Sequence, residues 1–316
     1  MWDKEKASLP YAKRNLSLQP KRATTKTMSK FINPFTDYGF KLIFGREVSK
    51  DLLIEFLNDL LEGERVITDL TFLNNEQLPD YPEGRGIIYD VYCTTDTGEK
   101  IIVEMQNRMQ SNFKERSIFY LSRAIVNQGR TGHDWKFEIK AVYGVFLMNF
   151  IMDKNIKLRT DVILADKETG ELFSEKFRQI FIALPLFKKS EEECETNFER
   201  WIYILNNMET LKRMPFKARK AVFEKLEDIA DVASMSPEDR ERYDNSVKVY
   251  RDYLVTMDAA EQKGIKEGLE KGIEKGMKEG TQRAQLKIAR NMKAKGIDNE
   301  SIAECTDLPL SIIEGL

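Results

Sequence analysis

Two short apolar segments joined by a turn constrain the fold of this chain more than any other feature. The segments are GIIYDVYCTT (residues 86–95) and KIIVEMQ (residues 100–106), and Asp96-Thr97-Gly98 lies between them. β-Branched and aromatic residues dominate both segments, and a short turn that contains glycine is typical of a β-hairpin. The sequence therefore predicts two adjacent antiparallel strands.

Each predicted strand is interrupted by one carboxylate, Asp90 in the first and Glu104 in the second. Burying an anion among apolar side chains is costly unless a cation compensates it. Because strand side chains alternate between faces, Glu104 and Gln106 project from the same face. The two carboxylates are therefore candidate ligands of a metal ion.

The register of the hairpin tests this idea. If the loop is Asp96-Thr97-Gly98 with a left-handed glycine, Asp90 lies directly opposite Glu104. Directly opposed residues have Cβ atoms about 4.5 to 5.5 Å apart, close enough for both carboxylates to bind one divalent ion. A two-residue loop would instead place Asp90 opposite Met105, so the metal hypothesis predicts the three-residue loop.

The amino-acid composition limits which metals the site could bind and which cellular compartment suits the protein. One histidine and three widely separated cysteines exclude His-rich and CxxC zinc sites and leave oxygen ligands, which suit Mg²⁺, Mn²⁺ or Ca²⁺. The isolated cysteines, the lack of a secretory signal and the absence of an apolar run of membrane length predict a cytoplasmic protein without a membrane anchor. His133 is interpreted as a turn or cap residue, and Pro79-Asp80 lies in a loop-like stretch and ranks behind Asp90 as a site.

The segments around the hairpin predict an α/β fold with helices on a mixed sheet. Helices are expected at 31–45, at 51–63 and at 112–130, and Thr36 or Asp37 is the expected N-cap of the first. Strands are expected at 66–73 and 138–150. The apolar runs at 157–164 and 178–186 either extend the sheet or form a separate hairpin. Beyond Ser190 the sequence is helical in character.

Charge and repeats suggest how the chain is divided. The expected parts are a disordered basic tail (1–30) with eight Lys/Arg against two acids, a main domain (31–189), a helical region (190–258), a glycine-repeat helix or linker (259–283) and a small helix-turn-helix-like segment (284–316). The tail could add sequence-independent attraction to phosphates.

Glycine recurs at every fourth position from Gly264 to Gly280, and an apolar residue follows each glycine except the last. Such a stripe drifts about 40° per repeat around a helix. Each glycine costs about 1 kcal/mol of helix stability relative to alanine. The repeat is therefore expected either to pack against a partner helix, in a homo-oligomer formed through the C-terminal helices, or to be a frayed linker.

Several motifs together resemble the PD-(D/E)XK nuclease superfamily, and more closely its Rpn branch of recombination-promoting nucleases and transposases. The motifs are NPFTDYGFKLIFG (33–45), YDVYCTTDTGEKIIVEMQ (89–106), KERSIFYLSR (114–123) and the glycine repeat followed by ESIAECTDLPLSIIEGL (300–316). The resemblance implies a restriction-endonuclease-like αβββαβ core with a mixed central sheet, followed by a helical C-terminal region. It also implies DNA as the substrate and Mg²⁺ or Mn²⁺ as the cofactor.

The resemblance also implies roles for particular residues. Asp90 and Glu104 would bind the metal, with the Met105 carbonyl as a third ligand, and Gln106 occupies the position where the superfamily usually has lysine. Gln106 can orient water or phosphate but brings no positive charge. Glu55 is the candidate for a first-helix glutamate, with a solvated surface position as the alternative.

Arg116 and Tyr120, one helical turn apart, are candidates for phosphate contact, with an ordinary surface pair as the alternative. The function expected is therefore that of a metal-dependent DNA endonuclease linked to recombination or transposition. The alternative is a catalytically weak or inactive nuclease-fold protein that acts through DNA binding or oligomerisation.

Overall fold

The computed structural model describes residues 29–78, 86–130, 135–218 and 220–316. The chain forms two compact units, the first ending at Ser246 and the second beginning at Val247. The helical segment 190–246 belongs to the same unit as the sheet. The basic tail before residue 29, His133 and Pro79-Asp80 lie outside the described residues, so the expectations for them stay predictions.

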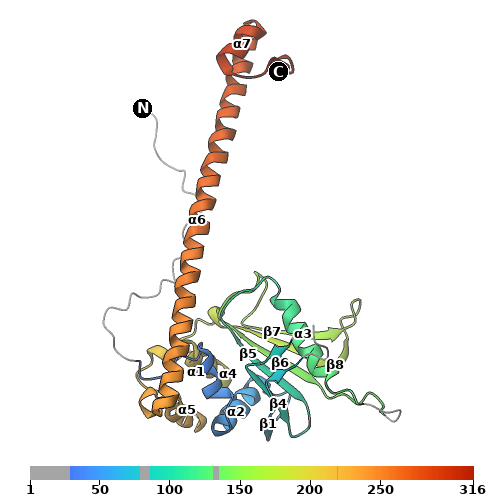
Figure 1. Cartoon of the computed structure of the whole chain (residues 1–316). Helices are drawn as coiled ribbons and strands as arrows, with labels where there is room; N and C mark the ends of the chain where they lie inside the picture. The colour runs from blue at the N-terminus through green and yellow to red at the C-terminus, as the bar shows by residue number, and fades with distance from the viewer. Residues whose placement is uncertain (1–28, 79–85, 131–134, 219) are drawn as a thin grey trace. The chain divides into compact units, whose positions relative to one another are not determined.

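The first unit is built on a six-stranded mixed sheet with strand order β1-β4-β5-β6-β8-β7 (Figure 1). Its strands are β1 (Leu70–Phe72), β4 (Val91–Thr95), β5 (Lys100–Gln106), β6 (Val142–Met148), β7 (Arg159–Ala165) and β8 (Leu172–Ala183), while β2 (Glu76–Gln77) and β3 (Ile87–Ile88) pair separately. β1, β4 and β5 are antiparallel, β5, β6 and β8 are parallel, and β7 runs antiparallel at the edge. The predicted α/β fold with a mixed sheet is confirmed, and the two late apolar runs extend this sheet.

The helices of the first unit follow the predicted order around the sheet. They are α1 (Asp37–Phe44), α2 (Lys50–Leu60), α3 (Phe113–Val126), α4 (Asn197–Asn207) and α5 (Val222–Ala230), with short 3₁₀ turns η1 (Glu47–Ser49), η2 (Leu184–Leu186), η3 (Met208–Thr210) and η4 (Val232–Ser234). Of the two N-cap candidates for α1, Thr36 is the cap, and its side chain accepts a hydrogen bond from the Gly39 N–H. Most helices and strands are shorter than the sequence patterns, and the strand expected at 66–73 is reduced to β1, whereas β5 matches its pattern and β8 begins before the expected run.

The β4–β5 hairpin has the register that the metal hypothesis requires. Val91 pairs with Val103 and Thr94 with Lys100, and Gly98 in the three-residue loop has a φ of 95°. The predicted loop and its left-handed glycine are therefore confirmed. Continued by one residue, this register places Asp90 opposite Glu104.

The strand predicted over 86–95 is broken at Tyr89 and Asp90, which separate β3 from β4. The Tyr89 N–H donates to the Asn75 carbonyl, and the Asn75 side chain donates to the Asp90 carbonyl. With these backbone groups bound to Asn75, Tyr89 and Asp90 belong to neither strand. The Asp90 side chain takes over the contact with β5 by accepting the Met105 N–H.

The two faces of the sheet are covered differently. Helix α3 packs on one face through Phe113, Leu121 and Ala124, which join a core with Ile102 and Phe146 of the strands (Figure 1). Because side chains alternate along β5, Glu104 and Gln106 lie on the same face as Ile102. The carboxylate pair therefore lies under α3.

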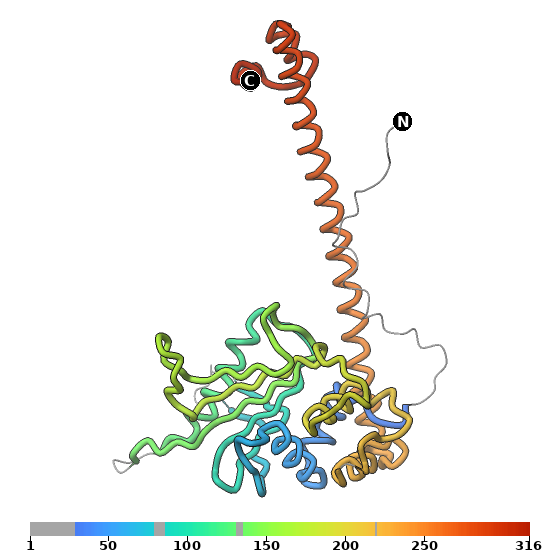
Figure 2. Tube along the Cα trace, turned by 180° about the vertical axis from the view of Figure 1, so that it is seen from behind, coloured from blue at the N-terminus to red at the C-terminus, as the bar shows by residue number. Residues whose placement is uncertain are grey.

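Helices α1, α2, α4 and α5 lie together, although α4 and α5 follow the sheet in sequence (Figure 2). Their aromatic side chains form a separate core. Phe44, Phe56 and Trp201 meet there with ring centroids 5.1 to 6.0 Å apart. The Trp201 Nε1–H donates to Asp59 at 2.9 Å, which satisfies the buried indole. This packing holds α1 and α2 in place beside the strands.

The second unit contains most of α6 (Pro237–Ala294), together with α7 (Asn299–Thr306) and α8 (Leu310–Glu314). Ala289, Ile302, Leu308 and Ile313 form its small core, and the predicted cap Asp298 accepts the Ser301 N–H at 2.8 Å. The glycine repeat is helical along its whole length. None of the helices in the described part of the chain is long and apolar enough to cross a bilayer.

Candidate metal centre

Asp90 and Glu104 are held against each other by backbone hydrogen bonds. The Asp90 N–H donates to Glu104 Oε1 at 3.1 Å, and the Met105 N–H donates to Asp90 Oδ2 at 2.9 Å. Each carboxylate is thus fixed by the main chain of the other strand segment. Glu104 is only 3% exposed, whereas Asp90 is partly exposed.

Burial and like charge make this pair difficult to ionise. Burial, followed by the neighbouring Asp90 charge, raises the pKa of Glu104 well above its usual value. Burial also raises the pKa of Asp90 to about 6, although the Met105 N–H and the charges of Lys41 and Arg116 act in the opposite direction. Two carboxylates in this position are stable as anions when a cation lies between them.

The donor set fits a hard divalent cation. Among the described residues no third Asp, Glu, His or Cys joins a cluster that could hold a metal. Mg²⁺ is commonly bound by one or two carboxylates while water and substrate phosphate complete its six ligands. The pair therefore suits Mg²⁺ or Mn²⁺ better than a structural zinc, and the Met105 carbonyl as a further ligand stays a prediction.

Gln106 contacts Glu104 directly. Its Nε2 donates to Glu104 Oε2 at 3.0 Å, while its Oε1 accepts from Arg116 Nη2 at 2.5 Å. Both ends of the amide are therefore used within the protein, and the side chain is 8% exposed. The resemblance implies that Gln106 orients water or phosphate, whereas its contacts in the structure orient Glu104.

Arg116 supplies a positive charge next to this amide. Its Nη1 also donates to Gln110 Oε1 at 2.7 Å, and its guanidinium carbon lies 5.5 Å from the centre of the Tyr120 ring. Tyr120 in turn packs edge-on against buried Tyr89, whose hydroxyl donates to the Tyr120 carbonyl at 3.0 Å. Arg116 thus reaches the carboxylate pair through Gln106, with Tyr120 beside its guanidinium, and phosphate contact by either residue stays a prediction.

Glu55 is not brought to this site. Its carboxylate lies 2.6 Å from the Lys220 ammonium, which also contacts Asp59 at 2.7 Å in the aromatic helix core. The polar face of α2 was visible in the sequence, but periodicity does not tell which face of the sheet a helix covers. For Glu55 the structure therefore favours the alternative of a carboxylate outside the site.

Two charged residues of α1 lie near Asp90 and were missed as site residues. The charges of Asp37 and Lys41 both act on the Asp90 carboxyl, and the two residues pair with each other at 2.7 Å. Helix α1 is tied to the end of β5 because the Asn107 side chain donates to the Phe35 carbonyl at 2.6 Å. The signal was present in DYGFK, where Asp37 and Lys41 are spaced by one helical turn.

A comparison with known protein families shows which family the chain belongs to. The sequence model of the PD-(D/E)XK nuclease family transposases matches residues 34–260. The chain belongs to this family. The match spans α1, the whole sheet with the Asp90–Glu104 pair, and the first part of α6, so the expected resemblance is confirmed.

Two further comparisons gave no relatives. No curated protein and no solved structure matches the chain significantly. Membership of the PD-(D/E)XK nuclease family transposases supports a nuclease-like or transposase-like role, and nucleases of this superfamily typically use divalent metals. The roles of individual residues rest on the geometry above.

Proposed function

We propose that this chain is a Mg²⁺-dependent endodeoxyribonuclease that hydrolyses phosphodiester bonds in DNA, in a recombination or transposition process in the cytoplasm. The observation that carries the proposal is the opposed Asp90–Glu104 pair under α3, in which Glu104 is buried and each carboxylate accepts a main-chain N–H from the other segment. A divalent ion held by such a pair polarises the phosphoryl oxygen and lowers the pKa of a bound water. Mn²⁺ is expected to substitute for Mg²⁺.

Each side chain at the site has a separate role in this proposal. Asp90 and Glu104 would hold the ion, and Gln106 fixes the rotamer of Glu104 through the 3.0 Å contact with its Oε2. Arg116 places the positive charge that the superfamily usually has on a strand lysine. Its guanidinium lies next to Gln106 and stabilises negative charge on a phosphate at the site.

The glutamine is compatible with activity because of this arrangement. A lysine at position 106 would have no acceptor to offer Arg116 and would add a second cation beside it. With Gln106, the amide accepts from Arg116 and donates to Glu104, so all three side chains are satisfied. The positive charge that the superfamily usually has on the strand is here on Arg116 of α3, and Tyr120 of the same helix packs beside the Arg116 guanidinium.

Plasmid cleavage tests the proposal against a catalytically inactive nuclease fold. We expect Mg²⁺-dependent nicking by the wild-type protein that stops with chelator, and a loss of about 100-fold or more in Asp90→Asn and Glu104→Gln. Asp96→Asn, an exposed carboxylate in the hairpin turn, is the matched control and is expected to cleave normally. Equal cleavage by all variants, or no cleavage by folded wild-type protein with either Mg²⁺ or Mn²⁺, would contradict the nuclease assignment.

Association of copies through the C-terminal helices forms a separate part of the proposal. It depends on the residues of α6, and none of these belongs to the carboxylate pair. The expected homo-oligomer can therefore be tested independently of cleavage.

A further inference from the structure

Helix α6 carries an unusually ordered surface between Gly264 and Gly280. Residues four apart on a helix form continuous rows along its surface, and packing between helices inserts such rows into the grooves between rows. In this segment each row consists of one kind of residue. One row is Gly264, Gly268, Gly272, Gly276 and Gly280, and the row beside it is Ile265, Leu269, Ile273 and Met277.

The apolar row is exposed although its side chains are large. Ile265 and Leu269 are each 63% exposed, Ile273 is 54% exposed and Met277 is 69% exposed. Removing such side chains from water stabilises an interface by roughly 25 cal/mol for each Å² of apolar surface buried. We call the apolar row the ridge.

The glycine row forms a groove beside the ridge. A Cβ atom added at any of the five glycines would meet nothing within 4 Å in the described part of the chain. Each glycine also lowers helix stability by about 1 kcal/mol relative to alanine. Five such residues in one regular helix are difficult to explain by helix stability, whereas a groove for a partner requires them.

We propose that two copies of this chain associate in parallel through this face, with the ridge of each helix in the glycine groove of the other. Rows of residues four apart interdigitate when two helices cross at about −50°, and small residues in a four-residue pattern allow the backbones to approach closely at such a crossing. A repeat period above 3.6 residues also favours the right-handed sense of this crossing. The contact is therefore centred near Gly272 and Ile273.

The face is complementary to itself, which favours a second copy over another partner. In a parallel two-fold arrangement, the ridge of one helix lies over the groove of the other, and each contact occurs twice. A face that carries both a ridge and a groove of matching length satisfies this condition without any other protein.

The charged rows agree with this pairing. The row next to the ridge reads Lys266, Glu270, Glu274, Lys278, and the row next to the groove reads Glu267, Lys271, Lys275, Glu279. In a parallel, in-register pair these two rows lie on the same side of the contact with opposite charges at every level.

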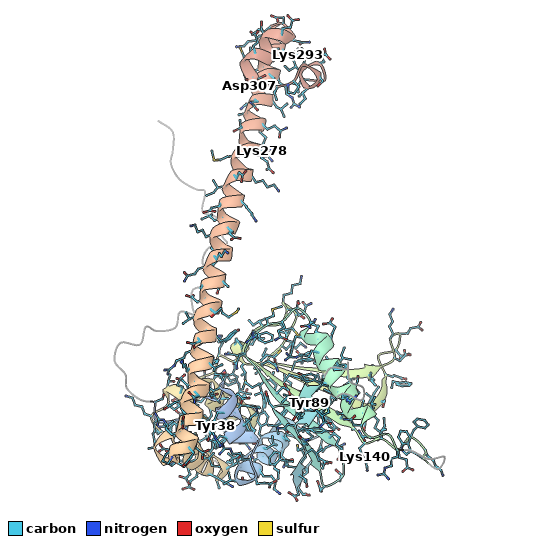
Figure 3. The ribbon with its side chains drawn as sticks, viewed as in Figure 1. Tyr38, Tyr89, Lys140, Lys278, Lys293 and Asp307 are labelled. Atoms are coloured by element: carbon cyan, nitrogen blue, oxygen red, sulfur yellow. The ribbon has the colours of Figure 1, made fainter. Side chains whose placement is uncertain are left out.

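These charged groups remain available to a partner helix. Within one helix the nearest pairs are loose, at 3.8 to 4.0 Å, and their side chains are 53% to 79% exposed. Lys278 extends outward from α6 in the same manner (Figure 3). Exposed pairs of this kind contribute little to affinity, but like charges at these levels would disfavour the pairing.

Substitution of the glycines separates this proposal from a solvated helix or linker. Glutamine is a better helix former than glycine, so Gly268→Gln/Gly272→Gln/Gly276→Gln should raise the helix content measured by circular dichroism. The same change fills the groove with three long side chains. The proposal therefore predicts a more stable helix and a weaker dimer in the same full-length variant.

Sedimentation equilibrium of the full chain measures the association. We expect the wild-type protein to dimerise reversibly and the triple variant to have a Kd at least about 30-fold higher. Ala259→Gln, which adds the same side chain to an exposed position of α6 before the repeat and outside the glycine row, is expected to dimerise like wild type. A wild-type protein that stays monomeric at about 100 µM, a triple variant that associates as tightly as wild type, or equal weakening in the control would each overturn the proposal.

Discussion

The Asp90–Glu104 pair is expected to make the metal-free protein less stable at neutral pH. Burial raises the pKa of Asp90 from 3.8 to about 6, so the folded state binds this proton more tightly than the unfolded state. The resulting stabilisation is fully present below about pH 4 and is lost as the pH rises through about 6. A shift of about two pH units at about 1.4 kcal/mol each corresponds to at most about 3 kcal/mol.

Asp90→Asn removes the charge and keeps an oxygen that can accept the Met105 N–H. In chelator at pH 7.5 we expect this variant to be more stable than wild type by up to about 3 kcal/mol. For a unit of this size that corresponds to a Tm higher by about 5 to 10 °C. At pH 4 the two proteins should melt at nearly the same temperature, because the wild-type carboxyl is then protonated in the folded state.

Thermal melts with and without Mg²⁺ complete this test. Ligand that binds only the folded state at ten times its Kd stabilises by about 1.4 kcal/mol, so Mg²⁺ should raise the wild-type Tm and leave Asp90→Asn unchanged. Asp96→Asn should follow wild type in every condition. A lower Tm for metal-free Asp90→Asn at pH 7.5, or a full Mg²⁺ shift in that variant, would refute the reasoning.

Three further predictions concern the surroundings of the pair. Gln106→Lys is expected to slow plasmid cleavage about 100-fold. Adding Arg116→Gln should recover most of the rate, because the double variant again has a single positive charge at this position. A fully active Gln106→Lys variant would contradict this prediction. Asp37→Asn should lower the initial rate of cleavage by about 10-fold or more, whereas Glu55→Gln should leave that rate unchanged under the same conditions. A loss of rate in Glu55→Gln but not in Asp37→Asn would contradict the placement of α1 at the site. Gly144→Ala should lower the free energy of unfolding by about 1 to 3 kcal/mol in urea titration, because its Cβ would lie 2.5 Å from a leucine of α3; an unchanged midpoint would contradict the tight packing of α3 on β6.

The hairpin shows what local sequence can predict. Strand alternation and the turn residues left a two-residue and a three-residue loop open, and the pairing of Asp90 with Glu104 that a metal site requires selected the three-residue loop, which the structure has. The break at Tyr89 and Asp90 was not predictable, since it depends on Asn75 from a distant loop. Local patterns therefore predicted which strands pair but not where one of them ends.

The site residues on helices show the limit of periodicity. The spacing of Arg116 and Tyr120 predicted a shared face, but the contact with Gln106 depends on how α3 packs on the sheet. The helical pattern likewise placed Glu55 on a polar face without telling that this face meets Lys220. Asp37 was considered only as a cap, because nothing local relates the start of α1 to the end of β5.

A crystal structure of the protein soaked in Mn²⁺ tests the central claim most directly, because Mn²⁺ is located by its anomalous scattering independently of the refined atoms. We expect one strong peak within about 2.5 Å of carboxylate oxygens of both Asp90 and Glu104, and no peak there in Asp90→Asn crystals. A fully occupied peak elsewhere with none between these two carboxylates, or the same peak in the variant, would contradict it.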